Sequence, residues 1–98
     1  MTVFAVQYFY NDKSAARDTH RPAHRAYLKN YLTSGALLAS GPYTDDARDG
    51  ALLIFSVPTP TDLHEILESD PFSIESLIDH VDIRAWNPVM GPWADNPT

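Results

Sequence analysis

The sequence predicts an α+β fold with the element order β-α-β-β-α-β, in which a four-stranded antiparallel sheet carries its helices on one face. Apolar, β-rich segments occur at both ends and in the middle of the chain, and segments with helical periodicity separate them. Glycine or proline marks most of the boundaries. At 98 residues, the chain is expected to form one domain over residues 1–98.

The first two elements are a strand and a long helix. Residues 2–10, TVFAVQYFY, are β-branched and aromatic almost without a break, which predicts a central strand covered on both faces. The polar stretch NDKSAARD that follows is expected to be a loop. A helix is predicted from about Arg21 to Ser34, because Pro22 suits a first helical turn and Gly35 suits the left-handed position after a helix.

The middle of the chain predicts two antiparallel strands. ALLAS at 36–40 indicates a short strand that GP ends, and ALLIFSV at 51–57 indicates a buried one. YTDDARDG between them carries acidic turn formers and ends in Asp49-Gly50, which is typical of a connection between antiparallel strands.

Two helix starts follow. Thr59, Pro60 and Asp62 form a capping pattern for a second helix. Asp70 and Pro71 repeat this pattern before a short helical segment. The apolar residues of that segment are Phe72, Ile74, Leu77 and Ile78.

The last strand completes a ferredoxin-like arrangement. HVDIRAW at 80–86 alternates polar and apolar residues, as a half-exposed strand does, and residues 87–98 are expected to be an extended, proline-rich tail. The chain offers no helix for the second face of the sheet. We therefore expect a homodimer joined through that face, a dimeric α/β barrel.

Composition excludes several classes of function. The formal net charge of −6 argues against nucleic acid as a partner. With no cysteine, the chain has neither a thiolate nucleophile nor a Cys-type zinc site, and its histidines and acids lack metal-ligand spacing. No phosphate-binding or dinucleotide motif is present, so no cofactor is expected. The absence of a signal peptide and of a membrane-spanning run predicts a cytoplasmic location, away from the membrane.

A histidine heads the apolar stripe of the first helix. At about 100° per residue, one face carries His24, Tyr27, Leu28, Tyr31 and Leu32. An imidazole that points inward needs a hydrogen-bond partner or a place at the mouth of a cavity, because burying it unpaired costs about 1–3 kcal/mol. Tyr27 is expected mainly to pack in the core, and its phenol at the edge of a pocket could donate to a substrate oxyanion.

The same helix region concentrates basic residues. Arg17, Arg21, Arg25 and Lys29 could attract a small anion. The alternative is a solvated helix face, because Arg25 and Lys29 fall off the apolar stripe.

Asp70 is the best candidate partner for His24. It follows the second helix, where the chain turns back toward the helical layer. A carboxylate that accepts from an imidazole fixes its tautomer, which is how His–Asp pairs become general acid/base groups. The alternative is that Asp70 is only a helix cap and that His24 is only a satisfied core residue.

Five segments, taken in order, resemble the YciI-like (YCII-related) family of the dimeric α/β-barrel superfamily: VFAVQYFY, RPAHRAYLKNYLTSGALLASGPYTDD, GALLIFSV, DPF and VDIRAWNPV. The likeness covers nearly all of residues 2–88. It implies that His24 and Asp70 form the active-site pair proposed for the family. It also implies a turn that lines the pocket, formed by Ser40, Gly41 and Pro42. A dehydrochlorinase and muconolactone-isomerase-like proteins are among the relatives, but no substrate is implied.

Two kinds of function fit these residues. The first is an enzyme that acts on a small anionic or cyclic organic molecule by proton transfer, in elimination, isomerisation or lactone chemistry, with no metal or cofactor. Besides the pair and the turn, Arg21 and Tyr27 are candidates for substrate contacts. The second is a non-catalytic binding or accessory dimer that uses the same pocket, and a purely structural dimer is a third reading.

Overall fold

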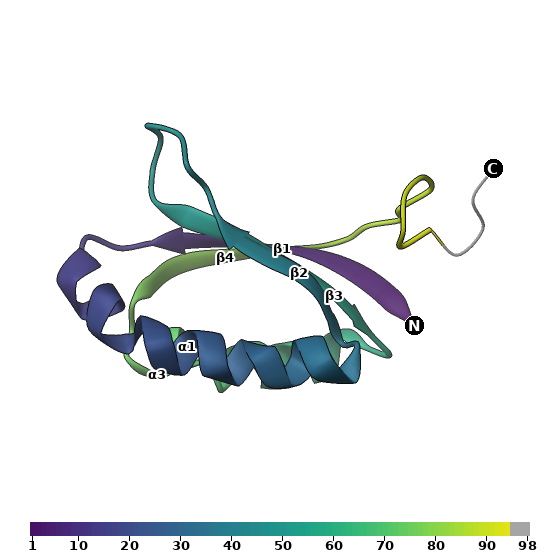
Figure 1. Ribbon diagram of the computed structural model, residues 1–98, viewed down its shortest axis with the longest axis horizontal. Coiled ribbons are helices and arrows are strands. Elements are labelled where there is room, and N and C mark those ends of the chain that lie inside the picture. The colour runs from purple at the N-terminus through teal and green to yellow at the C-terminus, as the bar shows by residue number, and fades with distance from the viewer. Residues whose placement is uncertain (95–98) are drawn as a thin grey trace.

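The computed structural model describes residues 1–94 and confirms the predicted α+β, ferredoxin-like architecture (Figure 1). The elements are β1 (Thr2–Tyr10), α1 (Ser14–Ser34), β2 (Leu37–Pro42), β3 (Gly50–Val57), α2 (Pro60–Glu68), α3 (Pro71–Ile74) and β4 (Ile78–Ala85). The strands pair antiparallel in the order β2-β3-β1-β4. The end of the predicted tail, residues 95–98, lies outside the described residues.

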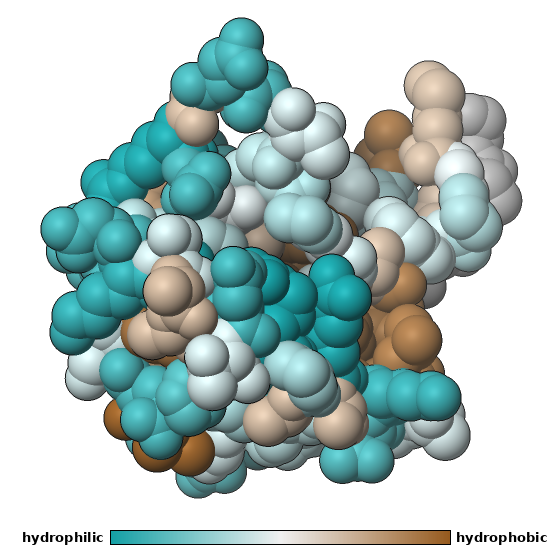
Figure 2. Space-filling view, turned by 60° about the vertical axis from the view of Figure 1, so that its left-hand side comes forward, coloured by the Kyte–Doolittle hydropathy of each residue, from teal (hydrophilic) through white to brown (hydrophobic). Residues whose placement is uncertain are grey.

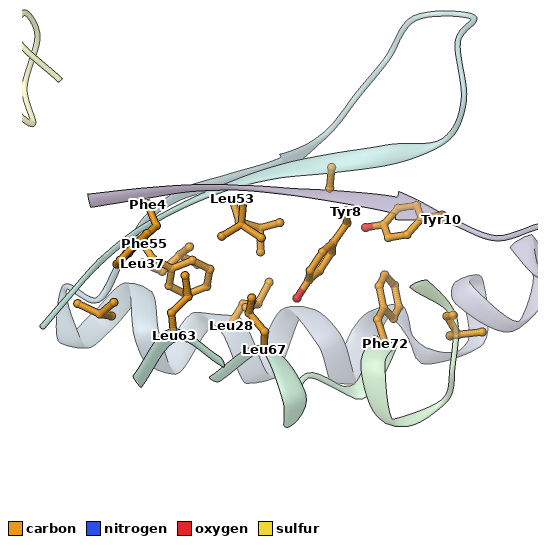
Figure 3. Packing of buried hydrophobic residues seen from close by; sticks show 14 residues of the cluster. Phe4, Tyr8, Tyr10, Leu28, Leu37, Leu53, Phe55, Leu63, Leu67 and Phe72 are labelled. Carbon is orange, nitrogen blue, oxygen red and sulfur yellow. The ribbon is translucent and has the colours of Figure 1, made fainter. Parts of the chain in front are cut away.

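The core fills the space between the sheet and the helices, which all lie on one face (Figure 1). Alternate residues of β1 point into it, because successive side chains of a strand face opposite sides. Figure 3 shows the Tyr8 side chain projecting from β1 toward the helical layer, between the Leu28 and Leu67 side chains and that of Phe72. Tyr8 is fully buried, so its hydroxyl requires a partner inside the protein.

Helix α1 is longer than predicted. It begins at Ser14 instead of Arg21, so only residues 11–13 of the predicted loop NDKSAARD are outside the helix, and the expectation of Pro22 in the first turn is wrong. Pro22 lies inside the helix, where it has no N–H to donate to the carbonyl of Asp18. The first turns of α1 are bent away from the axis of the rest of the helix (Figure 1), as expected beside an internal proline.

Contacts of Arg17 hold these first turns against the end of β1. Arg17 is buried, and its Nη1 donates to the carbonyl of Asn11 at 2.6 Å. Its guanidinium lies 4.7 Å from the centre of the Tyr10 ring and 3.5 Å from a carboxylate oxygen of Asp49. Arg17 is therefore a structural residue rather than part of a cationic surface.

Other boundaries also differ from the prediction, most clearly those of β2, α3 and β4. Strand β2 includes Gly41 and Pro42, which were expected to end it, and Pro42 is tolerated because β2 lies at the edge of the sheet. Helix α3 ends at Ile74, earlier than predicted, because Ser76 adopts a left-handed conformation with φ 56°. The chain then enters β4 at Ile78.

Gly50 fits a close contact between β1 and β3. A Cβ atom at this position would lie 2.3 Å from the carbonyl oxygen of Tyr8, a distance that a side chain cannot adopt. Glycine therefore allows β3 to begin directly beside the part of β1 that carries Tyr8.

Hydrophilic side chains dominate the face shown in Figure 2. The loop of residues 43–49, at the top of Figures 1 and 2, is almost entirely hydrophilic and projects from the sheet on the side away from the helices. Within residues 1–94, the structure has no helix with the length and apolar character needed to cross a membrane.

Candidate active site

His24 and Asp70 are in contact, as predicted from the sequence. Nδ1 of His24 lies 2.7 Å from Oδ1 of Asp70, although 46 positions separate the two residues in the sequence. The side chain of His24 is 10% exposed and that of Asp70 is 1% exposed. The pair is therefore shielded from water, which strengthens its electrostatic interaction.

Local capping chemistry fixes the position of Asp70. It is the N-cap of α3, with Pro71 at the first helical position, and its Oδ1 accepts from the backbone N–H of Phe72 at 3.0 Å. Its Oδ2 accepts from the Tyr8 hydroxyl at 2.9 Å. The carboxylate therefore contacts three polar groups from three different elements: α1, β1 and α3.

The imidazole of His24 is held in one orientation. Its ring is stacked on that of Phe72, with the centroids 3.9 Å apart and the planes 1° apart. Asp70 as a carboxylate can only accept, so Nδ1 of His24 carries the proton and Nε2 keeps its lone pair when the ring is neutral. Among residues 1–94, every fully buried side-chain nitrogen or oxygen has a hydrogen-bond partner, whereas Nε2 of His24 has none. Nε2 is therefore not fully buried, and His24 is one of the residues that line the adjacent cavity.

This cavity has a volume of about 390 Å³ and lies between α1 and the strands β2 and β3. Such a volume falls within the range of about 300–1,000 Å³ that is common for small-molecule sites. Its apolar part comes from α1, the inner face of the sheet and α3. The lining residues are Tyr10, Arg21, His24, Arg25, Leu28, Lys29, Leu32, Leu37, Ser40, Gly41, Pro42, Ala51 and Phe72.

Most of the predicted site residues meet at this cavity. The structure places Arg21 on its α1 wall, and Ser40, Gly41 and Pro42 on its β2 wall, around the same space as His24. The turn implied by the family resemblance is the end of β2, and it does lie at the pocket.

Asp70 and Tyr27 are not among the residues that line the cavity. Asp70 is behind His24, which it contacts, whereas Tyr27 forms a hydrogen bond with neither of them. Its hydroxyl donates to the backbone carbonyl of Ile66 at 2.7 Å. Around the axis of α1, Tyr27 lies about 60° from His24 on one side, whereas Leu28 and Arg25 lie about 40° and 100° away on the other. The cavity occupies the side of Leu28 and Arg25, so the expected substrate contact of Tyr27 is not supported by its position.

Three further residues of α1 line the cavity. Arg25 and Lys29 were expected to belong either to an anion site or to a solvated helix face, and the structure places their exposed side chains at the cavity. Leu32 was assigned to the apolar stripe, and it is 53% exposed at the cavity. At a spacing of four residues, Arg21, Arg25 and Lys29 form one row along α1, and His24, Leu28 and Leu32 form the next row. These two neighbouring rows could have indicated in the sequence that a second side of the helix faces an open space.

A second His–Asp pair lies on the opposite side of the sheet. Nε2 of His80 is 2.7 Å from Oδ1 of Asp82, but these side chains are 61% and 54% exposed. Within residues 1–94, no group of three or more His, Cys, Asp or Glu side chains could hold a metal ion.

The buried tyrosines of β1 are held in their neutral form. Burial, reinforced by the negative charge of Asp70 and the hydrogen bond to it, raises the pKa of Tyr8 far above its usual value. Burial also raises the pKa of Tyr10 to about 12. Both phenols therefore resist ionisation in the folded protein.

These shifts predict a loss of stability at alkaline pH. In the unfolded chain the phenols ionise near pH 10.0, whereas in the folded protein they stay neutral to about pH 12 or above. The free energy of unfolding should therefore be independent of these groups below pH 10 and fall as the pH rises from 10 to 12. Denaturant unfolding at intervals between pH 8 and 12 measures this, and Tyr8→Phe should reduce the slope. The exposed Tyr43→Phe is the control, and a flat wild-type profile would contradict the prediction.

A match to a known protein family covers most of the chain. A family model described as the YCII-related domain matches residues 1–87. No curated protein matches the chain significantly.

Solved structures share the fold. The 5-chloro-2-hydroxyhydroquinone dehydrochlorinase TftG from Burkholderia phenoliruptrix AC1100, in complex with 2,5-dihydroxybenzoquinone, is 25% identical with a TM-score of 0.77, and the match covers 95% of this chain and 99% of that one. An antibiotic biosynthesis monooxygenase is 16% identical with a TM-score of 0.57, over 92% and 100% of the two chains. Protein Atu4242 from Agrobacterium tumefaciens is 11% identical with a TM-score of 0.52, over 98% and 99%.

Proposed function

The chain belongs to the YCII-related domain family, and on this basis we propose that it is a small-molecule enzyme in which His24 transfers a proton and Asp70 orients it. The observation that carries the proposal is the 2.7 Å contact between Nδ1 of His24 and the buried Asp70, beside a cavity that Nε2 can reach. A base held by a buried carboxylate at the wall of a pocket is suited to acid/base catalysis.

The proposed reaction begins when Nε2 of His24 accepts a proton from a substrate C–H or O–H bond. The imidazolium that forms is stabilised by the carboxylate of Asp70, which the hydrogen bonds from Tyr8 and the Phe72 N–H hold in place. In an elimination, the electron pair of the broken C–H bond forms a double bond and a leaving group departs. In an isomerisation or lactone reaction, the same proton returns to a different atom of the substrate.

The dehydrochlorinase supports the choice of proton transfer. Its name describes the removal of hydrogen chloride from a hydroxylated ring, and its structure holds a quinone. Loss of hydrogen chloride requires a base and no nucleophile from the protein, which matches what His24 can provide. We extend the reaction class, and not the substrate, to this chain.

The functional unit that we propose is a homodimer of single domains. Among residues 1–94, no helix covers the second face of the sheet, and both the loop 43–49 and the residues directly after β4 rise on that side (Figure 1). The apolar side chain of Leu52 is 37% exposed there. A second copy of the same face would bury these groups. The cytoplasmic location stays a prediction.

Light scattering tests the dimer. The protein should have about twice the mass of the 11.0 kDa chain, because two sheet faces bury each other. Leu52→Glu should shift the protein toward the monomer by placing charges in the interface. A wild-type monomer at micromolar concentration would contradict the proposal.

A ligand panel tests the enzymatic function. Small aromatic acids and lactone acids are added to the wild-type protein, and its melting temperature and the consumption of each compound are measured. We expect at least one compound to raise the melting temperature, because ligands that bind only the folded state stabilise it, and to be converted. Stabilisation by ligands that are never converted would favour the non-catalytic binding module. No stabilisation by any compound would favour a structural dimer.

A further inference from the structure

Positive charge is concentrated at the cavity. The whole chain has 7 basic and 13 acidic residues, with a net charge of −6. Three of those basic residues, Arg21, Arg25 and Lys29, line the cavity, and no acidic residue does. The cavity is thus a cationic region on an acidic protein, which would draw anions toward it.

Protein contacts do not account for all of this charge. Arg21 forms an ion pair with Asp18, one turn away on α1. Among residues 1–94, the side chains of Arg25 and Lys29 form neither an ion pair nor a hydrogen bond. Like charges four residues apart on a helix destabilise the helix, so Arg25 and Lys29 do not stabilise α1. A ligand anion would relieve the repulsion.

The rest of the cavity is suited to an apolar body. Leu28, Leu37 and Phe72 give it an apolar surface, and His24 lies on the same wall. Along α1, Arg25 directly follows His24, and Lys29 is five residues from His24, a rise of about 7.5 Å along the helix axis at 1.5 Å per residue. An acid group held by Arg25 and Lys29 would therefore lie farther along α1 than His24 and leave the apolar body of the ligand on the His24 side.

We propose that this cavity takes an organic acid, with an apolar, ring-sized body against Leu28 and Phe72 and a carboxylate held by Arg25 and Lys29. This inference rests on the proposed function and names the class of its substrate. The guanidinium of Arg25 matches a carboxylate in shape, and Lys29 supplies a second charge. The charge holds and orients the ligand while His24 acts on the other part of it.

Binding of 2-naphthoate and of its neutral analogue 2-naphthamide, measured by isothermal titration calorimetry, tests the inference. The wild-type protein should bind 2-naphthoate about tenfold more tightly, because only the acid makes charge-assisted hydrogen bonds. The Arg25→Gln/Lys29→Gln double variant should lose this preference and keep its affinity for the amide. Raising the salt concentration should weaken the binding of the acid alone.

Lys13→Gln is the matched control for Lys29→Gln, because Lys13 is exposed, precedes α1 and is not among the cavity-lining residues. It should leave the preference for the acid unchanged. Equal binding of acid and amide, no binding of either compound, or a preference that survives in the double variant would overturn the inference. Those results leave the role of His24 standing. A His24→Gln variant that binds 2-naphthoate normally but converts substrates at the wild-type rate would instead overturn the proposed function alone.

Discussion

Asp70→Ala should destabilise the protein by about 3–5 kcal/mol, the range expected when one partner of a buried charged pair is removed. Alanine would leave the Tyr8 hydroxyl, the Phe72 N–H and Nδ1 of His24 without their acceptor. Each unsatisfied group adds its own cost of desolvation. Urea unfolding measures the change as a lower midpoint at an unchanged slope.

Two further variants separate the contributions. Asp70→Asn keeps one oxygen acceptor but turns an amide N–H₂ toward another donor. Its free energy of unfolding should therefore fall by less than that of Asp70→Ala. Asp18→Ala removes the acceptor of the exposed Arg21–Asp18 pair on α1, away from the sheet face that the proposed dimer would bury. This control should leave stability nearly unchanged, because water replaces the lost contact. If Asp70→Ala were as stable as Asp18→Ala, Asp70 would not anchor the site.

His24→Gln should lower turnover of a converted substrate by about 10²-fold or more, the usual effect of losing a general acid or base. Glutamine can still donate to Asp70, so the variant should remain folded, with the mass of the wild-type protein and a melting temperature within a few degrees of it. A loss in kcat at constant KM would show that His24 acts in the chemical step.

His64→Gln is the matched control, since His64 is exposed on α2 and is not among the cavity-lining residues. It should retain full turnover. A His24→Gln protein that is stable and fully active would remove His24 from the mechanism. A His24→Gln protein that unfolds would show that His24 has a structural role in packing, and no catalytic role would then be needed to explain its place on the apolar stripe.

The element order and the candidate pair could be predicted because their signals are local. Asp70 before Pro71 marks a helix start wherever it lies, and the position of His24 on an apolar stripe directs it inward. The only further inference needed was that the carboxylate of Asp70, near the helical layer, would contact His24. The observed contact of 2.7 Å confirms that inference.

The contacts that the sequence did not predict depend on tertiary packing. Nothing in TVFAVQYFY distinguishes Tyr8, whose hydroxyl meets a residue 62 positions away, from the other aromatic residues of β1. The start of α1 was misplaced because Pro22 is a strong local signal, and the buried contacts of Arg17 outweigh it.

The sequence left two interpretations of Arg25 and Lys29 open, an anion site and a solvated helix face, for a geometric reason. The stripe analysis treats a helix as having one buried face and one solvent face. In this fold α1 has a third, lateral flank beside the edge strand β2, where Arg25 and Lys29 are neither in the core nor simply solvated.

The dual use of Asp70, as the cap of α3 and as the partner of His24, has a consequence for protein engineering. The reactive centre cannot be exchanged as a module, since altering its carboxylate also removes a helix start. The β2 wall of the cavity has no comparable structural role. Ser40 is exposed on an edge strand, and a Cβ atom added at Gly41 would meet nothing within 4 Å. New substrate preferences should therefore be sought by diversifying the end of β2 in a library that leaves α3 intact.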